Sequence, residues 1–111
     1  MAGEDSSVEV TAADKGKTVE IRRGDKVDIK LEENATTGYR WAIDKMDEEV
    51  LELESSDFAT APDIGIGGGG ERRFSFKAKG TGTARVELKL WREWEGDASV
   101  IDRYDLTIRV E

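Results

Sequence analysis

The feature that most constrains this chain is an alternation of apolar and polar residues with a period of two. The clearest run has apolar residues at every second position from 84 to 90 and charged residues between them. The same alternation recurs over 26–31, 73–78 and 104–110. Because successive side chains of a β-strand point to opposite faces, each run predicts a strand with one buried face.

Shorter series predict further strands. Apolar pairs at 8–10 and 19–21 indicate two short strands, and residues 39–43 form another alternating set. Within that set Trp41 is expected to be a core residue. The less regular segment 50–53 is either a strand or one helical turn. The count is therefore seven or eight strands.

The fold class predicted by this pattern is all-β, an immunoglobulin-like antiparallel β-sandwich of seven to eight strands. Turn-forming residues recur about every ten residues, and burial is one-sided along each strand. A closed barrel is the alternative. We expect a single domain over residues 1–111, with residues 1–6 as a flexible tail, because a chain of this length can bury a core without disulfides or metals.

Charge argues against two classes of partner. The chain has 25 acidic and 17 basic residues, a formal net charge of −8, and no basic cluster. We therefore expect no nucleic acid partner and no polybasic membrane attachment. No apolar stretch approaches the roughly 18 residues of a spanning helix. The start MAGEDSS lacks the pattern of a secretory signal, which leaves open a cytoplasmic protein or a mature exported form.

Two residue types are missing, and their absence limits the possible chemistry. The chain has no histidine and no cysteine. Nucleophilic catalysis by Ser-His or Cys-His pairs is therefore impossible, and the commonest transition-metal ligands are lacking. Carboxylate-pair hydrolysis and calcium binding remain open on composition alone, although no twelve-residue calcium loop is present. We expect a protein that is not an enzyme and that holds no metal and no cofactor.

Three connections are longer or more unusual than a turn requires. Loop 1 comprises Asn34, Ala35, Thr36, Thr37, Gly38 and Tyr39. Loop 2 comprises Gly65, Ile66, Gly67, Gly68, Gly69 and Gly70. Loop 3 comprises Trp91, Arg92, Glu93 and Trp94. In an antiparallel sandwich, loops separated by an even number of strands share an end, so we expect all three at one end.

Each loop has a structural and a functional interpretation. The hydroxyls of loop 1 could bond to the loop's own backbone. The glycines of loop 2 could form a flexible tip, or could let a partner approach the backbone closely. Loop 3 has two tryptophans and an arginine, residue types that are enriched at the energetic centres of protein interfaces. Because an exposed Trp94 on a loop is difficult to justify by folding, loop 3 favours a binding role.

In this order the loops resemble the chagasin-type inhibitors of papain-like cysteine peptidases, the ICP family. The family signatures are an Asn-Pro-Thr-Thr-Gly-aromatic loop, a Gly-x-Gly-Gly loop and an Arg-Pro-Trp loop. Loop 1, the glycines at 67–70 and Arg92-Glu93-Trp94 match them. The second signature could instead be placed on residues 65–68, although the spacing to Phe74 favours 67–70. Ala35 and Glu93 stand where the family pattern has proline.

The resemblance implies a reversible, competitive inhibitor whose three loops occlude the active-site cleft of a papain-like cysteine peptidase. Thr36, Thr37 and Gly38 would shield the catalytic thiolate of the target. The glycines at 67–70 would pair by their backbone, and Trp94 would pack on an apolar wall. We expect a monomer. The alternative is an immunoglobulin-like adhesion or assembly module that binds another protein surface through the same loops.

Overall fold

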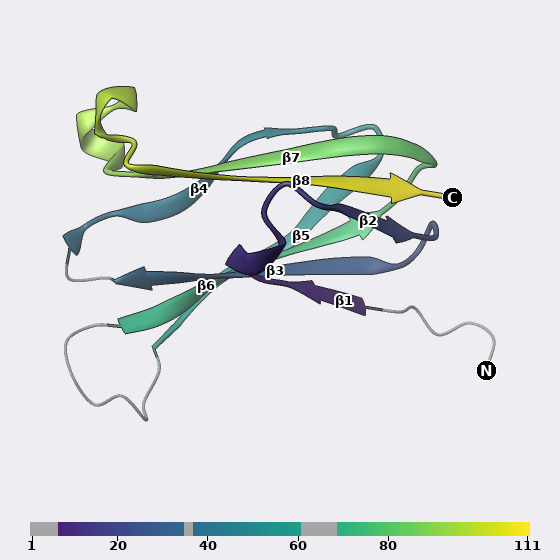
Figure 1. Cartoon of the computed structure of the whole chain (residues 1–111), viewed down its shortest axis with the longest axis horizontal. Coiled ribbons are helices and arrows are strands. Elements are labelled where there is room, and N and C mark those ends of the chain that lie inside the picture. Colours follow the sequence, from purple (N-terminus) through teal and green to yellow (C-terminus); the bar gives the residue numbers. More distant parts are fainter. Residues whose placement is uncertain (1–6, 35–36, 61–68) are drawn as a thin grey trace.

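The computed structural model describes residues 7–34, 37–60 and 69–111, and within them the chain forms eight strands in two facing sheets (Figure 1). The strands are β1 Ser7–Val10, β2 Thr18–Ile21, β3 Lys26–Asn34, β4 Arg40–Met46, β5 Leu51–Thr60, β6 Gly69–Ala78, β7 Gly82–Trp91 and β8 Asp102–Val110. The short 3₁₀ helices are η1 Ala12–Asp14, η3 Glu93–Glu95 and η4 Asp97–Ser99. One sheet has the order β1-β3-β6-β5 and the other has the order β2-β8-β7-β4. The tail predicted at residues 1–6 lies outside the described residues.

The predicted sandwich is confirmed, with one correction to its strand pairing. The sheets are mixed, because β1 pairs in parallel with β3 and β2 pairs in parallel with β8. Parallel neighbours require a long crossover connection, and residues 11–25 form one between β1 and β3 by passing through β2 in the opposite sheet. Periodicity within a strand carries no information about such pairings.

The alternation in the sequence places the core as predicted. The fully or nearly buried residues between the sheets include Val27, Ile29, Leu31, Phe74, Phe76, Ala84, Val86, Leu88, Tyr104, Leu106, Ile108 and Val110. Trp41 is 8% exposed, which confirms it as a core residue. The Tyr104 hydroxyl donates to the carbonyl of Thr11 over 2.9 Å and so attaches the start of η1 to β8. Burial, followed by the charges of Asp14 and Asp105, raises the pKa of Tyr104 to about 12.

The ambiguous segment at 50–53 begins a ten-residue strand, β5. Leu51 is fully buried, whereas the residues that follow it are exposed as far as Asp57. Among the described strands β5 pairs with β6 alone, which makes it an edge strand, and its register shifts between Leu53 and Ser55. An edge strand with a bulge and a polar surface shows little alternation, which is why the sequence did not indicate its full length.

Strand register brings the stems of the three loops together at one end of the molecule, opposite the C-terminus (Figure 1). Asn34 at the end of β3 lies opposite Gly69 at the start of β6. Arg40 at the start of β4 lies opposite Trp91 at the end of β7. The predicted shared end is therefore confirmed for the described stems.

Candidate functional site

One hydroxyl, that of Thr37, holds the described part of loop 1 together. The Oγ1 atom of Thr37 donates to the carbonyl of Asn34 over 2.8 Å and accepts from the amide of Tyr39 over 3.3 Å. Gly38 between them has a φ of +82°, a conformation that side chains rarely adopt. The structural interpretation of the loop hydroxyls is thus correct for Thr37. Ala35 and Thr36 lie outside the described residues.

Arg92 fastens loop 3 to loop 1. Its Nε and Nη2 atoms donate to the carbonyl of Thr37 over 3.2 and 3.1 Å. Its guanidinium carbon lies 4.4 Å from the centre of the Tyr39 ring, and Nη1 lies 3.4 Å from a carboxylate oxygen of Glu95. Arg92 is predicted from the sequence to lie in an interface, but these contacts use its donors within the protein. Arg92 therefore acts first as a link between two loops.

Trp94 packs against Gly38 while remaining largely exposed. A Cβ atom on Gly38 would lie 2.8 Å from Cη2 and 3.3 Å from Cζ2 of the Trp94 indole. The Trp94 residue, on η3, is nevertheless 69% exposed, as predicted from its place on a loop. We call Thr37, Gly38, Tyr39, Arg92 and Trp94 the loop 1–loop 3 unit. It presents a large apolar side chain on a backbone that is fixed from two sides.

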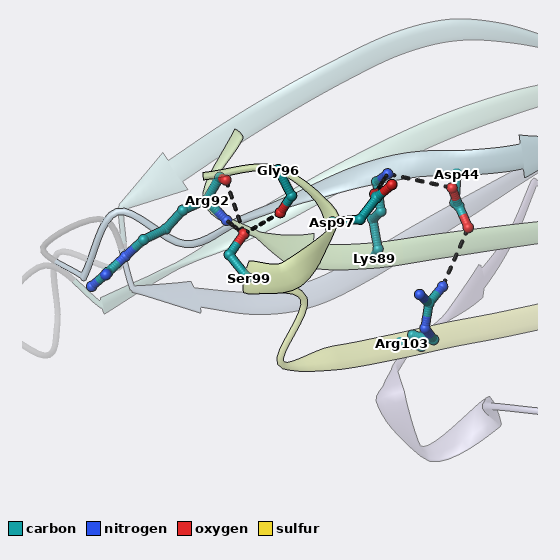
Figure 2. A network of polar contacts seen from close by, with 7 residues as sticks. All are labelled: Asp44, Lys89, Arg92, Gly96, Asp97, Ser99 and Arg103. Atoms are coloured by element: carbon teal, nitrogen blue, oxygen red, sulfur yellow. Dashed lines mark hydrogen bonds and ion pairs between the residues drawn. The ribbon is translucent and has the colours of Figure 1, made fainter. Parts of the chain in front are cut away.

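The base of loop 3 is held by Ser99, a residue that sequence reasoning missed. Its buried hydroxyl accepts from the amide of Arg92 over 3.0 Å. It can donate to the carbonyl of Arg92 at 2.9 Å or to that of Gly96 at 2.7 Å (Figure 2). The Arg92 side chain extends away from Ser99 in this view. Ser99 thus fixes the backbone from which Arg92 reaches loop 1.

A second polar network attaches η4 to the outer face of the sheet that contains β7. Lys89 lies 3.0 Å from a carboxylate oxygen of Asp97 and 3.4 Å from one of Asp44, which in turn lies 3.3 Å from Arg103 (Figure 2). The hydrogen bond to Asp97, reinforced by the charges of Asp97 and Asp44, raises the pKa of Lys89. Its ammonium also lies 3.7 Å from the centre of the Trp91 ring. These contacts restrain the segment that follows loop 3.

The boundaries predicted for the loops need correction at four residues. Asn34 is the last residue of β3, and Trp91 is the last residue of β7, partly buried and paired with Arg40. Gly69 and Gly70 begin β6 and are already paired within the sheet. Pairing with neighbouring strands extends these strands beyond the residues that show apolar alternation. The local sequence does not indicate where such pairing ends.

Gly70 has a packing role within the sheet. A Cβ atom there would lie 2.5 Å from Cζ of Phe58 and 2.7 Å from the carbonyl of Ala59. Its backbone lies between Glu33 on β3 and Thr60 on β5. A glycine is required at position 70 because the Phe58 ring covers the backbone there. We therefore no longer expect Gly70 to contact a partner. The rest of loop 2, Gly65, Ile66, Gly67 and Gly68, lies outside the described residues.

Two further properties concern only the part of the chain that the structure describes. Here no group of three or more acidic residues is placed to hold a metal ion. No helix in it has the length and apolar character needed to cross a membrane.

Glu93→Pro is expected to stabilise the protein by about 0.4–1 kcal/mol, because proline restricts the unfolded chain. Glu93 is the first residue of η3, a position where proline fits, and its amide has no hydrogen bond among those found for the described backbone. Arg92 before it has φ −99° and ψ 110°, as proline requires of its predecessor. Thermal unfolding of Glu93→Pro and of the control Glu93→Ala measures this gain. A lower melting temperature for proline than for alanine would contradict it.

Comparison with known proteins identifies relatives over nearly the whole chain. A model described as chagasin family peptidase inhibitor I42 matches residues 20–108. Chagasin from Trypanosoma cruzi is 29% identical over an aligned length of 108 residues, and the match covers 93% of this chain and 97% of chagasin.

Solved structures show the same fold. The cysteine protease inhibitor EhICP2 from Entamoeba histolytica has a TM-score of 0.88 at 21% identity and covers 99% of this chain and 100% of its own. PbICP-C, solved in complex with falcipain-2, has a TM-score of 0.66 at 14% identity and covers 100% of this chain and 94% of its own. These likenesses confirm the sandwich architecture.

The family match also decides between the two functions that the sequence left open for the protein. It favours inhibition over an adhesion or assembly role, and it confirms that the protein is not an enzyme. The resemblance to the chagasin-type inhibitors is likewise confirmed. Because the family model matches most of its length, this chain belongs to the chagasin family of peptidase inhibitors.

Proposed function

We propose that this protein inhibits papain-like cysteine peptidases reversibly and competitively by placing its three loops in the active-site cleft. The observation that carries this proposal is the loop 1–loop 3 unit, in which Trp94 is exposed yet seated on Gly38. EhICP2 is a cysteine protease inhibitor, and PbICP-C forms a complex with falcipain-2. A shared family and fold support a target of the same class.

The geometry of the unit suits an inhibitor because its five residues are held in place before binding. Arg92 and Ser99 hold the backbone on which Trp94 stands, so little conformational entropy remains to be lost on docking. A peptidase cleaves only a peptide bond that is held in near-attack geometry. A wedge that fills the cleft without presenting such a bond blocks the nucleophile and remains intact.

Each loop has a proposed role in this arrangement. Thr36, Thr37 and Gly38 face the catalytic thiolate of the target, and Trp94 packs on an apolar wall of the cleft. For loop 2 the proposed contact is through the backbone of residues 65–68, since Gly69 and Gly70 belong to β6. Arg92 contributes by orienting loop 1 relative to loop 3.

Steady-state kinetics with papain test the proposal. We expect an apparent KM that rises with inhibitor concentration at constant kcat, and full recovery of activity on dilution. Mass spectrometry after prolonged incubation should show an intact chain. Noncompetitive kinetics, or cleavage of the protein in step with the loss of inhibition, would contradict this function.

Trp94→Ala is expected to raise the inhibition constant about 30-fold, because interfacial tryptophan anchors contribute about 2 kcal/mol or more. The loss should appear as faster dissociation. Stability should hardly change, since the residue is 69% exposed. Ile101→Ala is the control, because Ile101 is also apolar and 59% exposed but lies outside the three loops. If Trp94→Ala instead lowers the melting temperature and leaves inhibition intact, Trp94 is a folding residue.

A further inference from the structure

A charged pair closes the core at the end that carries the loops. Val27, Ile29 and Leu31 form the inward row of β3, and Glu33 continues that row with 5% exposure. Arg72 on β6 continues the inward row that contains Phe74 and Phe76. Charged residues rarely occupy such positions unless they are paired.

The pair is bidentate and packed. Arg72 donates from Nε to one Glu33 oxygen over 3.1 Å and from Nη2 to the other over 2.7 Å. The Arg72 guanidinium lies 5.3 Å from the centre of the Phe58 ring, and the edge of that ring covers Gly70. Phe58 is on β5 and Arg72 is on β6, directly opposite each other. The pair therefore joins both stems of loop 2 to β3.

Glu33 also joins the two stems of loop 1. Its Oε1 atom accepts from the amide of Trp41 over 2.7 Å, and the Trp41 indole donates to the carbonyl of Glu32 over 3.0 Å. β3 and β4 lie in different sheets, so no ladder of backbone hydrogen bonds connects them. In a hairpin such a ladder fixes the loop. Here the hydrogen bonds of Glu33 and Trp41 connect the two stems instead.

We propose that Glu33 and Arg72 are positioning residues that hold the stems of loops 1 and 2 in their binding geometry without touching the target. This inference rests on the proposed function. Replacing a buried ion pair by apolar residues is often neutral or even stabilising, so stability alone does not account for one. A bidentate pair does supply a defined geometry. Loss of the pair leaves the domain folded but lowers the fraction of molecules whose loops are ready to bind.

Arg72→Lys, compared with Arg73→Lys, isolates this effect. Lysine keeps the charge but loses the bidentate geometry and the planar contact with Phe58. Arg73 is the matched control, because it pairs with Glu71 over 3.0 Å on the exposed face of the same strand. Stopped-flow measurement with papain, below the melting temperature of both variants, should show association about tenfold slower for Arg72→Lys only. Dissociation should hardly change, whereas Trp94→Ala acts on dissociation.

Glu33→Gln tests the other residue of the Glu33–Arg72 pair, with Glu71→Gln as its control. Glutamine keeps an acceptor for the Trp41 amide and loses the carboxylate that pairs with Arg72. Slower association is again expected for Glu33→Gln and not for Glu71→Gln. An unchanged association rate in both Arg72→Lys and Glu33→Gln would overturn the inference.

Hydrogen exchange separates this inference from the proposed function. In the free protein the amides of Tyr39 and Trp41 should exchange about tenfold faster in Arg72→Lys and Glu33→Gln, and at the wild-type rate in the two controls. If the wild-type protein does not inhibit papain, the proposed function fails and exchange alone decides the positioning role. Wild-type exchange at both amides would show that the pair does not hold loop 1.

Discussion

Gly38→Ala is expected to raise the inhibition constant against papain by about 100-fold while the sandwich still folds. Two effects combine. A left-handed conformation costs an alanine about 1–2 kcal/mol, and φ at this position is +82°. The new Cβ atom would also lie 2.8 Å from Cη2 of Trp94, so the indole has to move away from residue 38. The interface thus loses both the conformation of loop 1 and the position of its aromatic anchor.

Gly16→Ala is the matched control for this substitution. Gly16 has a φ of +79°, and a Cβ atom there would meet no other atom within 4 Å. The unfavourable φ is therefore nearly the same, but Gly16 has no contact with Trp94 and lies away from the three loops. Both variants should lose a similar amount of stability in thermal unfolding, and only Gly38→Ala should lose inhibition. Equal inhibition constants in the two variants would remove loop 1 from the interface.

Trp41→Ala is expected to destabilise the fold by about 3–5 kcal/mol, as large truncations in a core do. Trp41 is 8% exposed, and its removal leaves a cavity at the end of the core. It also leaves the carbonyl of Glu32 without its indole donor. Chemical denaturation followed by circular dichroism measures the loss. An unfolding midpoint equal to that of the wild type would contradict the core assignment.

Trp94→Ala is the control for the denaturation experiment on Trp41→Ala. Trp94→Ala removes an equal volume from a residue that is 69% exposed, so its unfolding free energy should remain close to that of the wild type. We thus expect Trp41→Ala to lower stability and Trp94→Ala to weaken binding. A similar destabilisation in both would mean that loop 3 is part of the folding core.

The loop contacts also predict that substitutions in loops 1 and 3 do not act independently. Arg92 donates to Thr37, and Trp94 rests on Gly38, so a change on either side disturbs the other. The effects of single substitutions in the two loops are therefore not expected to add.

Several features of the fold and the site could be predicted from local sequence because they depend on local periodicity. One-sided alternation indicated the strands over 26–31, 73–78, 84–90 and 104–110, and the core position of Trp41 followed from the same rule. Glu33 was not among the predicted residues, although it continues the series Val27, Ile29 and Leu31 of the inward row of β3. A charge at such a position is the signal that could have revealed the Glu33–Arg72 pair.

Other features were decided only when distant strands came together. Three features depend on register with another strand. They are the parallel pairing of β1 with β3 and of β2 with β8, the strand positions of Gly69 and Gly70, and the length of β5. The internal role of Arg92 depends on a carbonyl that is 55 residues away in the sequence. Alternation along one strand determines which face is buried, because side-chain direction is a local property of the backbone. Which strands meet, and which loops therefore touch, is set by packing the two faces against each other.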